Sequence, residues 1–426
     1  MGRRNGLMAT LAAIAAVVLL AGCGGGGDSG SGGGSDATTT SRGPITYVQG
    51  KDNTNTIRPL LDKWNTAHPD EKITFKEQSD EADQQHDDLV QHFQAKDVEY
   101  DVVSVDVVWT AEFAAKGWLH PLKDSFALDT APLLPATVAT ATYNKTLYAA
   151  PVTSDGGMLY YRKDLVPTPP KTWDEMMGMC SIAKENNLDC YAGQFFKYEG
   201  LTVNAAEAIN TDGGKIVGDD GKTPEVNSAE AAAGLGRLAD AYKNGNIPKQ
   251  AITYTEEEGR QSFQAGKLLF LRQWPYVYSL ATTEGGSKVK GKFDVAPLPG
   301  TSGAGASSLG GHNAAISAYS DHKATALDFL KFLETEESQK WFVTDGSNAP
   351  ALAALYDDPA LIKEAPYLPT LKTSILNAVP RPVTPFYPAV TKAVQDNAYA
   401  AIKGDKPVQQ ALTDMQAAIT AAASTG

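Results

Sequence analysis

Hydrophobic residues recur with two different spacings between residues 45 and 105, and these spacings predict alternating strands and helices. Short apolar or alternating stretches predict strands at Ile45–Val48, Ile73–Glu77 and Tyr100–Val105. Apolar positions three or four residues apart predict helices at Ile57–His68 and Asp80–Ala95. Repeated strand-helix units are typical of an α/β fold with a largely parallel sheet.

Another buried strand is predicted at Leu268–Leu271, and the residues around it have the pattern of a binding site. Gly266 stands where a helix should end in a left-handed residue, and Pro275 ends the strand. Ligands of open α/β sheets bind beyond the carboxyl ends of strands. The side chains expected in that crevice are Arg272, Gln273, Trp274, Tyr276 and Tyr278.

Aromatic rings beside hydrogen-bonding groups suit a sugar ligand. The apolar face of a pyranose packs on an indole ring, while Arg and Gln side chains bond its hydroxyls. The alternative is that Trp274 and Tyr276 are core residues or form the wall of a lobe.

Asp106 directly follows the strand Tyr100–Val105, where a ligand acceptor is expected, and Val107–Trp109 is expected to start the next helix. An Asp in this position is also a common helix N-cap, and the two roles do not exclude each other. Farther along the chain, Gly310 and Gly311 follow a Gly/Ser loop and would let the backbone approach a ligand closely.

With 426 residues, the chain exceeds one ordinary hydrophobic core and is expected to form two lobes. The Thr153–Gly157 turn is a predicted crossing between them, and a loop at Tyr198–Gly200 is expected before helices that begin at Ala205 and Ser228. Helices at Lys323–Leu333 and Ser338–Phe342 are expected to pack on the first lobe. Lobe 1 is assigned residues 44–150 and 297–347, and lobe 2 residues 155–293 and 351–426.

The N-terminus predicts export and membrane anchoring. Arg3 and Arg4 precede an apolar run, Leu7–Leu20, which is too short to span a membrane and has the length of a signal-peptide core, so residues 1–22 are assigned to a signal peptide. The sequence Leu20-Ala21-Gly22-Cys23 resembles the bacterial lipobox, in which the Cys becomes the lipid-modified first residue. Residues 23–43 are rich in Gly, Ser and Thr and are expected to form a flexible tether. The alternative is an ordinary secreted protein with a chance cysteine.

The net charge, the two remaining cysteines and the histidines bear on which partners, disulfides and metals the protein can have. Removing residues 1–22 takes away Arg3 and Arg4 and changes the formal charge from −13 to −15, which argues against nucleic acid as a partner. Cys180 and Cys190 are expected to form a disulfide in an exported protein, with free buried thiols as the alternative. The six His residues show no metal-ligand spacing, so neither a metal nor a cofactor is expected.

Several blocks of sequence resemble the sugar-binding lipoproteins of bacterial ABC importers, within the extracellular solute-binding family, and among them the trehalose/maltose-binding proteins in particular. The blocks are Asp101–Leu122, Leu159–Leu165, Tyr198–Leu201, Trp274–Tyr276, Val295–Pro299, Leu309–Gly311 and Ala378–Pro382. The resemblance implies an α/β, two-lobed periplasmic-binding-protein-like fold whose lobes close around a ligand in the cleft between them.

The resemblance also implies a set of ligand-binding residues. Asp106 and the Gly310–Gly311 backbone would bind from one lobe, and Trp274, Tyr276 and Arg381 from the other. The full set is Asn53, Asn55, Asp80, Gln85, Asp106, Asp155, Tyr198, Trp274, Tyr276, Gly310, Gly311, His312 and Arg381. The chain departs from the family at one end of the pocket. It has Asn53 where the relatives carry an acid, Gln85 in the stretch where they carry arginine, Thr153 for a hinge tyrosine and His312 for an aromatic residue.

The function implied is a monomeric receptor on the outer face of the cell membrane. It would bind a small sugar, such as trehalose or another α-linked disaccharide, and deliver it to ABC permease subunits. A glycoside hydrolase is the alternative from another class, but it would need two carboxylates at a set separation, for which Asp106 and Asp155 are candidates only by default. A surface sugar sensor of the same fold is the third hypothesis.

Overall fold

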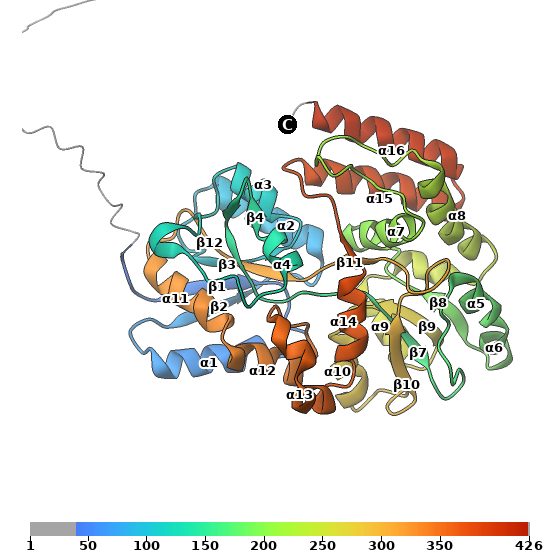
Figure 1. Cartoon of the computed structure of the whole chain (residues 1–426), viewed down its shortest axis with the longest axis horizontal. Coiled ribbons are helices and arrows are strands. Elements are labelled where there is room, and N and C mark those ends of the chain that lie inside the picture. Colours follow the sequence, from blue (N-terminus) through green and yellow to red (C-terminus); the bar gives the residue numbers. More distant parts are fainter. Residues whose placement is uncertain (1–39, 425–426) are drawn as a thin grey trace, which may run out of the picture. The chain divides into compact units, whose positions relative to one another are not determined.

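Residues 40–424 are described by the computed structural model, in which two β-sheets organise the chain (Figure 1). The first sheet has the strand order β2-β1-β3-β12-β6. Its strands are β1 (Ile45–Gln49), β2 (Ile73–Glu77), β3 (Val102–Asp106), β6 (Ala149–Pro151) and β12 (His312–Ile316). Strand β1 pairs in parallel with β2 and β3, whereas β12 pairs antiparallel with β3 and β6. The parallel strands bring their carboxyl ends to one edge, where the residues that follow them meet.

The helices around the first sheet follow the predicted hydrophobic pattern. Helices α1 (Ile57–Ala67), α2 (Ala82–Gln94) and α11 (Lys323–Leu333) confirm predicted helices. Trp64 of α1 and Phe329 of α11 are buried in one apolar cluster. The remaining elements here are α3 (Thr110–Ala115), η2 (Asp124–Phe126), α4 (Pro135–Thr140), β4 (Thr142–Tyr143), β5 (Thr146–Leu147) and α12 (Glu336–Gly346).

The start of α3 was predicted wrongly. Val107–Trp109 form a turn instead of the first turn of the helix, which begins at Thr110. The Asp106 carboxylate accepts a hydrogen bond from the N–H of Val108 at 3.1 Å, and this local bond stabilises the turn.

The second sheet has the strand order β10-β7-β9-β8. Its strands are β7 (Met158–Arg162), β8 (Asp189–Ala192), β9 (Leu268–Gln273) and β10 (Phe293–Pro297). Every residue of β9 is buried, and Gly266 before it has a φ of 71°, which confirms the predicted buried strand and left-handed glycine. The helices that follow in this part of the chain are α5 (Trp173–Gly178), α6 (Cys180–Glu185), α7 (Glu199–Thr211), α8 (Ala229–Lys243), η3 (Lys249–Thr253), α9 (Glu256–Gln264), α10 (Val277–Thr283), η4 (Ala353–Asp357), α13 (Pro359–Glu364), α14 (Leu368–Leu376), α15 (Tyr387–Lys403) and α16 (Val408–Ala423).

Helix α7 begins at Glu199, so the expected loop at Tyr198–Gly200 and the helix start at Ala205 are both wrong. Glycine has low helix propensity, which favoured the loop. In the structure the ring of Tyr198 lies against Gly200, where a Cβ atom would collide with it. Packing of the Tyr198 ring thus explains a glycine in the first turn.

Three short stretches of chain connect the two sheets and lie side by side. Thr153 forms a β-bridge with Pro350, and the N–H of Ser154 donates to the carbonyl of Ala349 at 3.0 Å. Asp155 and Gly310 exchange backbone hydrogen bonds of 3.0 and 2.8 Å. Next to them, β11 (Ser307–Leu309) pairs with β13 (Ala378–Pro380).

The return to the first sheet comes later than the boundary expected at residue 297. The carbonyl of Gly300 accepts from the N–H of Trp173 at 2.8 Å, and the N–H of Ala306 donates to Thr211 Oγ1 at 3.0 Å. Both partners belong to the elements around the second sheet. The chain rejoins the first sheet only at β12.

The predicted tether, residues 23–43, lies mostly outside the described residues, as do the predicted signal peptide and Cys23. Its last residues are attached to the folded body, which corrects the expected end of the tether. Arg42 forms ion pairs with Glu71 and Asp328, and the N–H of Gly43 donates to Thr325 Oγ1 at 3.2 Å. Within residues 40–424, no helix combines the length and the apolar character needed to cross a membrane.

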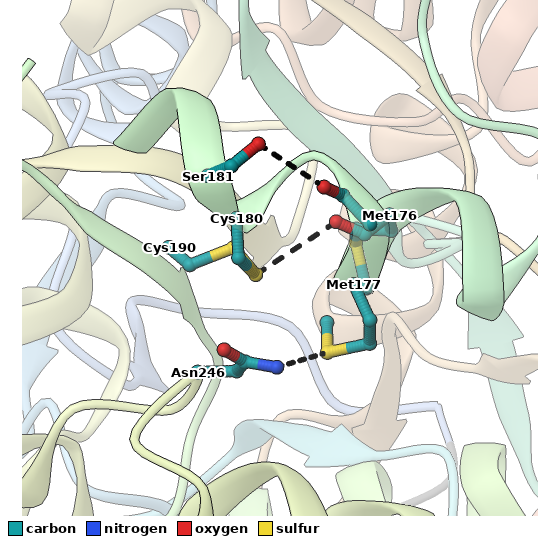
Figure 2. Close-up of a disulfide and its surroundings, with 7 residues drawn as sticks. Met176, Met177, Cys180, Ser181, Cys190 and Asn246 are labelled. Atoms are coloured by element: carbon teal, nitrogen blue, oxygen red, sulfur yellow. Dashed lines mark hydrogen bonds between the residues drawn. A yellow bond between two sulfur atoms is a disulfide. The ribbon is translucent and has the colours of Figure 1, made fainter. Parts of the chain in front are cut away.

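Cys180 and Cys190 are joined by a disulfide that connects α6 to β8 (Figure 2). Their Cα atoms are 5.1 Å apart, and both side chains are buried. The surroundings are rich in sulfur: the Met176 carbonyl oxygen lies 3.8 Å from Cys180 Sγ, and Asn246 Nδ2 lies 3.5 Å from Met177 Sδ. The bond therefore links a helix to the strand of the second sheet that follows it, and both cysteines belong to the hydrophobic core.

We expect the Cys180→Ala/Cys190→Ala double variant to be less stable than the wild type by roughly 2–3 kcal/mol, because the bond closes a short loop and restricts the unfolded chain. Denaturant unfolding of both proteins measures this difference. Reductant should lower the stability of the wild type and leave the double variant unchanged. Labelling of both cysteines in exported protein without reductant would show that the bond is absent in the cell.

Candidate functional site

A cavity of about 240 Å³ lies between the carboxyl edge of the first sheet and the end of β9. Most of the predicted ligand-binding residues line it: Asn53, Asp80, Gln85, Asp106, Asp155, Trp274, Tyr276, Gly310, Gly311, His312 and Arg381. The structure therefore brings together side chains that are separated by more than three hundred positions in the sequence. Asn55 and Tyr198 are the members of the predicted set that do not line the cavity.

Asn55 and Tyr198 support neighbouring cavity residues instead. Asn55 is exposed and has a φ of 53°, and its N–H donates to the carbonyl of Asp52 in the turn before α1. Tyr198 is 2% exposed, and its hydroxyl donates to Glu256 Oε2 at 2.5 Å. Glu256 itself lines the cavity, so Tyr198 orients a cavity acid from outside the cavity.

Trp274 is an aromatic wall of the cavity and is held on several sides. Its backbone N–H donates to Gln273 Oε1 at 2.9 Å, and the outer edge of its ring lies against Gly310, where a Cβ atom would be only 2.8 Å from the ring. Beside it, the hydroxyl of Tyr276 donates to Glu257 Oε1 at 2.9 Å. A rigid aromatic surface of this kind binds apolar ring faces with little loss of side-chain entropy.

Arg272, Gln273 and Tyr278 do not reach the cavity, which corrects the expectation that they bind the ligand. Arg272 is 1% exposed and pairs with Glu207 inside the protein. The side chain of Gln273 forms hydrogen bonds with the backbone of two residues that line the cavity: it donates to the carbonyl of Glu256 and accepts from the N–H of Trp274. The sequence could not show which side chains of β9 point toward the cavity. Every residue of this strand is buried, so no alternation of apolar and polar residues marks its two faces.

Asp106 and Arg381 meet across the cavity. Asp106 Oδ1 accepts from Arg381 Nη2 at 2.9 Å, while another nitrogen of the same guanidinium bonds Glu199. Glu199 is also bonded by the hydroxyls of Tyr387 and Thr391, at 2.5 and 2.6 Å. Burial raises the pKa of Glu199, and the neighbouring Arg381 charge counteracts this. The Nε of Arg381 is buried and has no hydrogen-bond partner among the described residues.

Asp155 is an acid of the cavity whose burial is not compensated by an ion pair or by hydrogen bonds to both of its oxygens. Burial raises its pKa to about 7, and the nearby Asp106 carboxylate adds to this effect. Within the described part of the chain, its Oδ1 atom is buried and has no hydrogen-bond partner. A buried acceptor without a partner is costly, and the raised pKa means that protonation of Asp155 lowers this cost.

Besides the Asp106–Arg381 pair, a second contact outside the cavity joins the elements around the first sheet to those around the second. Asp83 in α2 accepts a hydrogen bond from Gln395 Nε2 at 3.2 Å and lies close to the N-terminus of α7 at Glu199. Burial, followed by the charge of Glu81, raises the pKa of Asp83 to about 6. The sequence predicted only a helix here, because nothing in a helical pattern shows which polar side chain will meet a distant helix end.

The remaining predicted residues line one end of the cavity. His312 begins β12 opposite Asp106 and lines the cavity, and its pKa is lowered because the surrounding protein displaces water from the ring. Gln85 Nε2 donates to the Ser79 carbonyl at 2.9 Å, and Asp80 lies 3.9 Å from Lys51 Nζ. This end presents the amides of Asn53 and Gln85 in place of the acid and the arginine expected from the family, and the imidazole of His312 in place of the expected aromatic residue.

Carboxylates dominate the lining and give it a negative field. The acids are Asp52, Asp80, Asp106, Asp155, Glu199, Glu256 and Glu257, against the cations Lys51 and Arg381. An anionic ligand such as a sugar phosphate would be repelled, while neutral hydroxyl groups would find acceptors. Among residues 40–424 there is no group of three or more His, Cys, Asp or Glu that could hold a metal. Glu199, Glu256 and Glu257 were missed by the sequence analysis, although Glu199 and Tyr198 are adjacent in a recognised block.

Comparisons with known proteins agree with this geometry. Residues 50–340 match the family described as bacterial extracellular solute-binding protein. A probable ABC transporter-binding protein of Deinococcus radiodurans is 34% identical over 306 residues, covering 69% of this chain and 72% of the relative.

Solved structures share the fold. Maltose-bound MalE3 of T. maritima is 32% identical, with a TM-score of 0.83 over 88% of this chain and 98% of that protein. An ABC transporter solute-binding protein from Thermotoga lettingae TMO, bound with α-D-tagatose, has a TM-score of 0.81 over 89% of this chain and 100% of that protein. Its 23% identity supports a shared fold alone. The α/β fold is therefore two-lobed, with one lobe built on each sheet.

We expect Asp155→Asn to make the protein more stable at pH 8, by up to roughly 4 kcal/mol, and to have little effect at pH 4. With its pKa raised to about 7, Asp155 binds its proton more tightly in the folded than in the unfolded chain. The wild type therefore loses stability as the pH rises from about 4 to 7, and the amide variant lacks this loss. Thermal unfolding of both proteins across this pH range measures it, with the exposed Asp62→Asn variant as control. Parallel pH profiles for wild type and Asp155→Asn would contradict the assignment.

Proposed function

The chain belongs to the bacterial extracellular solute-binding proteins, and on that basis we propose that it is the receptor of an ABC importer for a small neutral sugar. The observation that carries the proposal is the cavity in which Trp274 offers an aromatic face among carboxylate acceptors. An α-linked disaccharide such as trehalose or maltose suits this combination of a flat apolar surface and a polar rim. The 32% identity with the maltose-bound T. maritima protein supports the same class of ligand.

In this proposal the ligand acts by stabilising the closed arrangement of the lobes. Asp106 and His312 belong to one lobe, and Trp274 and Tyr276 to the other, so a sugar that contacts both favours closure. The stretches around Thr153, Gly310 and Pro350 would act as the hinge, because they are the connections between the two sheets. The closed form would then be presented to the permease.

Binding without hydrolysis is the expected activity. A glycosidase needs one carboxyl as acid and a second as nucleophile or base. Here Asp106, the second carboxyl that Asp155 would need, is committed to Arg381 and to the backbone of Val108, and Glu199 is committed to Arg381, Tyr387 and Thr391. Carboxylates held in this way are suited to accept ligand hydrogen bonds.

The location we propose is the outer face of the cell membrane, by a lipid on Cys23. The lipobox-like sequence and the Gly/Ser-rich stretch after it support this, and the family is one of exported proteins. The folded body would then begin at about Ser41, where the chain first bonds α11.

We expect wild-type protein to bind an α-linked disaccharide in calorimetry and Trp274→Ala to weaken that binding by at least tenfold, since losing a buried aromatic anchor costs roughly 2–4 kcal/mol. Asp106→Asn should weaken binding as well, by about 1.5–3 kcal/mol, and should also lower stability because it loses the charge that pairs with Arg381. Trp173→Ala, which alters an indole outside the cavity, is the control and should leave the affinity unchanged. Release of monosaccharide during incubation would instead indicate a hydrolase, and silence with every α-glucoside would reject the ligand class.

We expect Cys23→Ala to move the protein from the membrane fraction to the soluble exported fraction, because no acyl chain could then be attached. Mass spectrometry of the wild-type N-terminal peptide should show the added lipid. Membrane partitioning that persists in Cys23→Ala would contradict the anchor.

A further inference from the structure

The guanidinium of Arg272 stacks on the ring of Trp274 from inside the second lobe. Its Cζ atom lies 3.9 Å from the centroid of the indole ring. Trp274 lines the cavity and Arg272 does not, so the two groups form consecutive layers behind the cavity surface. A cation over an indole face is an attractive arrangement, and it is stronger where water is excluded.

The guanidinium is itself fixed in its plane. Glu207 of α7 accepts from Nε at 2.8 Å and from Nη2 at 2.5 Å, while Gln194 Oε1 lies 3.2 Å from Nη1. Two parallel bonds to one carboxylate define both the position and the orientation of an Arg side chain. The fixed guanidinium in turn restricts where the indole beside it can lie.

Glu207 also contacts the stretch of chain that includes Gly310, which lies against the outer edge of the Trp274 ring. Its Oε1 accepts from the N–H of Ser308 in β11 at 3.0 Å, two positions before Gly310. Gly157 lies so close to the pair that a Cβ atom there would be 2.6 Å from Arg272 Nη2 and 2.7 Å from Glu207 Oε1. The buried Arg272–Glu207 ion pair thus contacts Trp274 and also two of the connections between the lobes, at Gly157 and at Ser308.

We propose that Arg272 is a positioning residue for ligand binding, acting through Trp274. Held by Glu207, it keeps the indole against Gly310 in the orientation that a sugar ring stacks on. The inference rests on the proposed function for its ligand, but the placement of Trp274 by Arg272 is a property of the ligand-free protein.

The Arg272→Lys variant distinguishes two roles of Arg272: holding the Trp274 ring in position and neutralising the charge of Glu207. Arg272→Lys keeps a positive charge for Glu207 but has neither the planar stack nor the paired bonds. We expect it to weaken sugar binding roughly 3- to 30-fold. Arg237→Lys is the matched control, because Arg237 makes an equivalent two-bond pair with Asp212 in the same lobe and lines no part of the cavity. It should leave the affinity unchanged.

A double-mutant cycle with Trp274→Ala tests the route of action. If Arg272 acts through the ring, Arg272→Lys has no further effect on affinity once Trp274 is removed. Losses that add up would overturn the proposal, as would an unchanged affinity in Arg272→Lys. If Arg272→Lys folds poorly, Arg272→Met/Glu207→Gln serves instead, because it removes both buried charges together and keeps an acceptor for Ser308.

Fluorine NMR of 5-fluorotryptophan-labelled protein provides a readout without ligand. The Trp274 resonance, assigned by its absence in Trp274→Phe, should shift and broaden in Arg272→Lys, while the Trp173 resonance stays in place. An unmoved Trp274 resonance would overturn the positioning role even if sugar binds. A moved resonance in a protein that binds no sugar would retain the positioning role and reject the proposed function.

Discussion

The arrangement of the cleft depends on one buried positive charge, that of Arg381. Transferring a guanidinium into a protein interior costs several kcal/mol unless charged partners replace its water. At 3% exposure Arg381 has two such partners, Asp106 from the first lobe and Glu199 from the first turn of α7. Glu199 is in turn compatible with burial because a helix N-terminus favours an anion and because Tyr387 and Thr391 donate to it. The need of one cation for partners therefore brings α7, α15 and β3 to the same place and couples the two lobes.

The polar groups around the cavity divide into those whose hydrogen bonds are satisfied within the protein and two buried atoms that have no partner among the described residues. Tyr198, Gln273 and Arg272 are buried behind the surface and hold Glu256 and Trp274 in position. Asp155 Oδ1 and Arg381 Nε are also buried, but they have no hydrogen-bond partner within residues 40–424. Each buried polar atom without a partner costs stability, and such costs are tolerated where the surrounding arrangement serves function.

Much of the fold could be predicted from the sequence because its signals are local. The strand at Leu268–Leu271, the left-handed Gly266 and the helix at Lys323–Leu333 follow from apolar spacing and glycine chemistry. What failed depended on distant partners. Arg272 looked like a ligand donor until Glu207, from a helix far away in the sequence, proved to bind it. Likewise Gly200 indicated a loop because nothing local shows that the Tyr198 ring fills the space beside it. The family resemblance located cavity positions well, since it reports on the folded arrangement, but it could not show which of them were already paired.

The position of β12 has a consequence for how the chain acquires its structure. This strand, at residues 312–316, lies between β3 and β6, whose residues precede it by more than 150 positions. The first lobe therefore has a gap in its sheet until about three-quarters of the polypeptide has been synthesised. Pairings between such distant segments form slowly, because a long loop must be closed before the contacts can compensate. In an exported protein, such a delay would favour a leading segment that is still unfolded during synthesis, and an unfolded segment is what a secretion channel can thread.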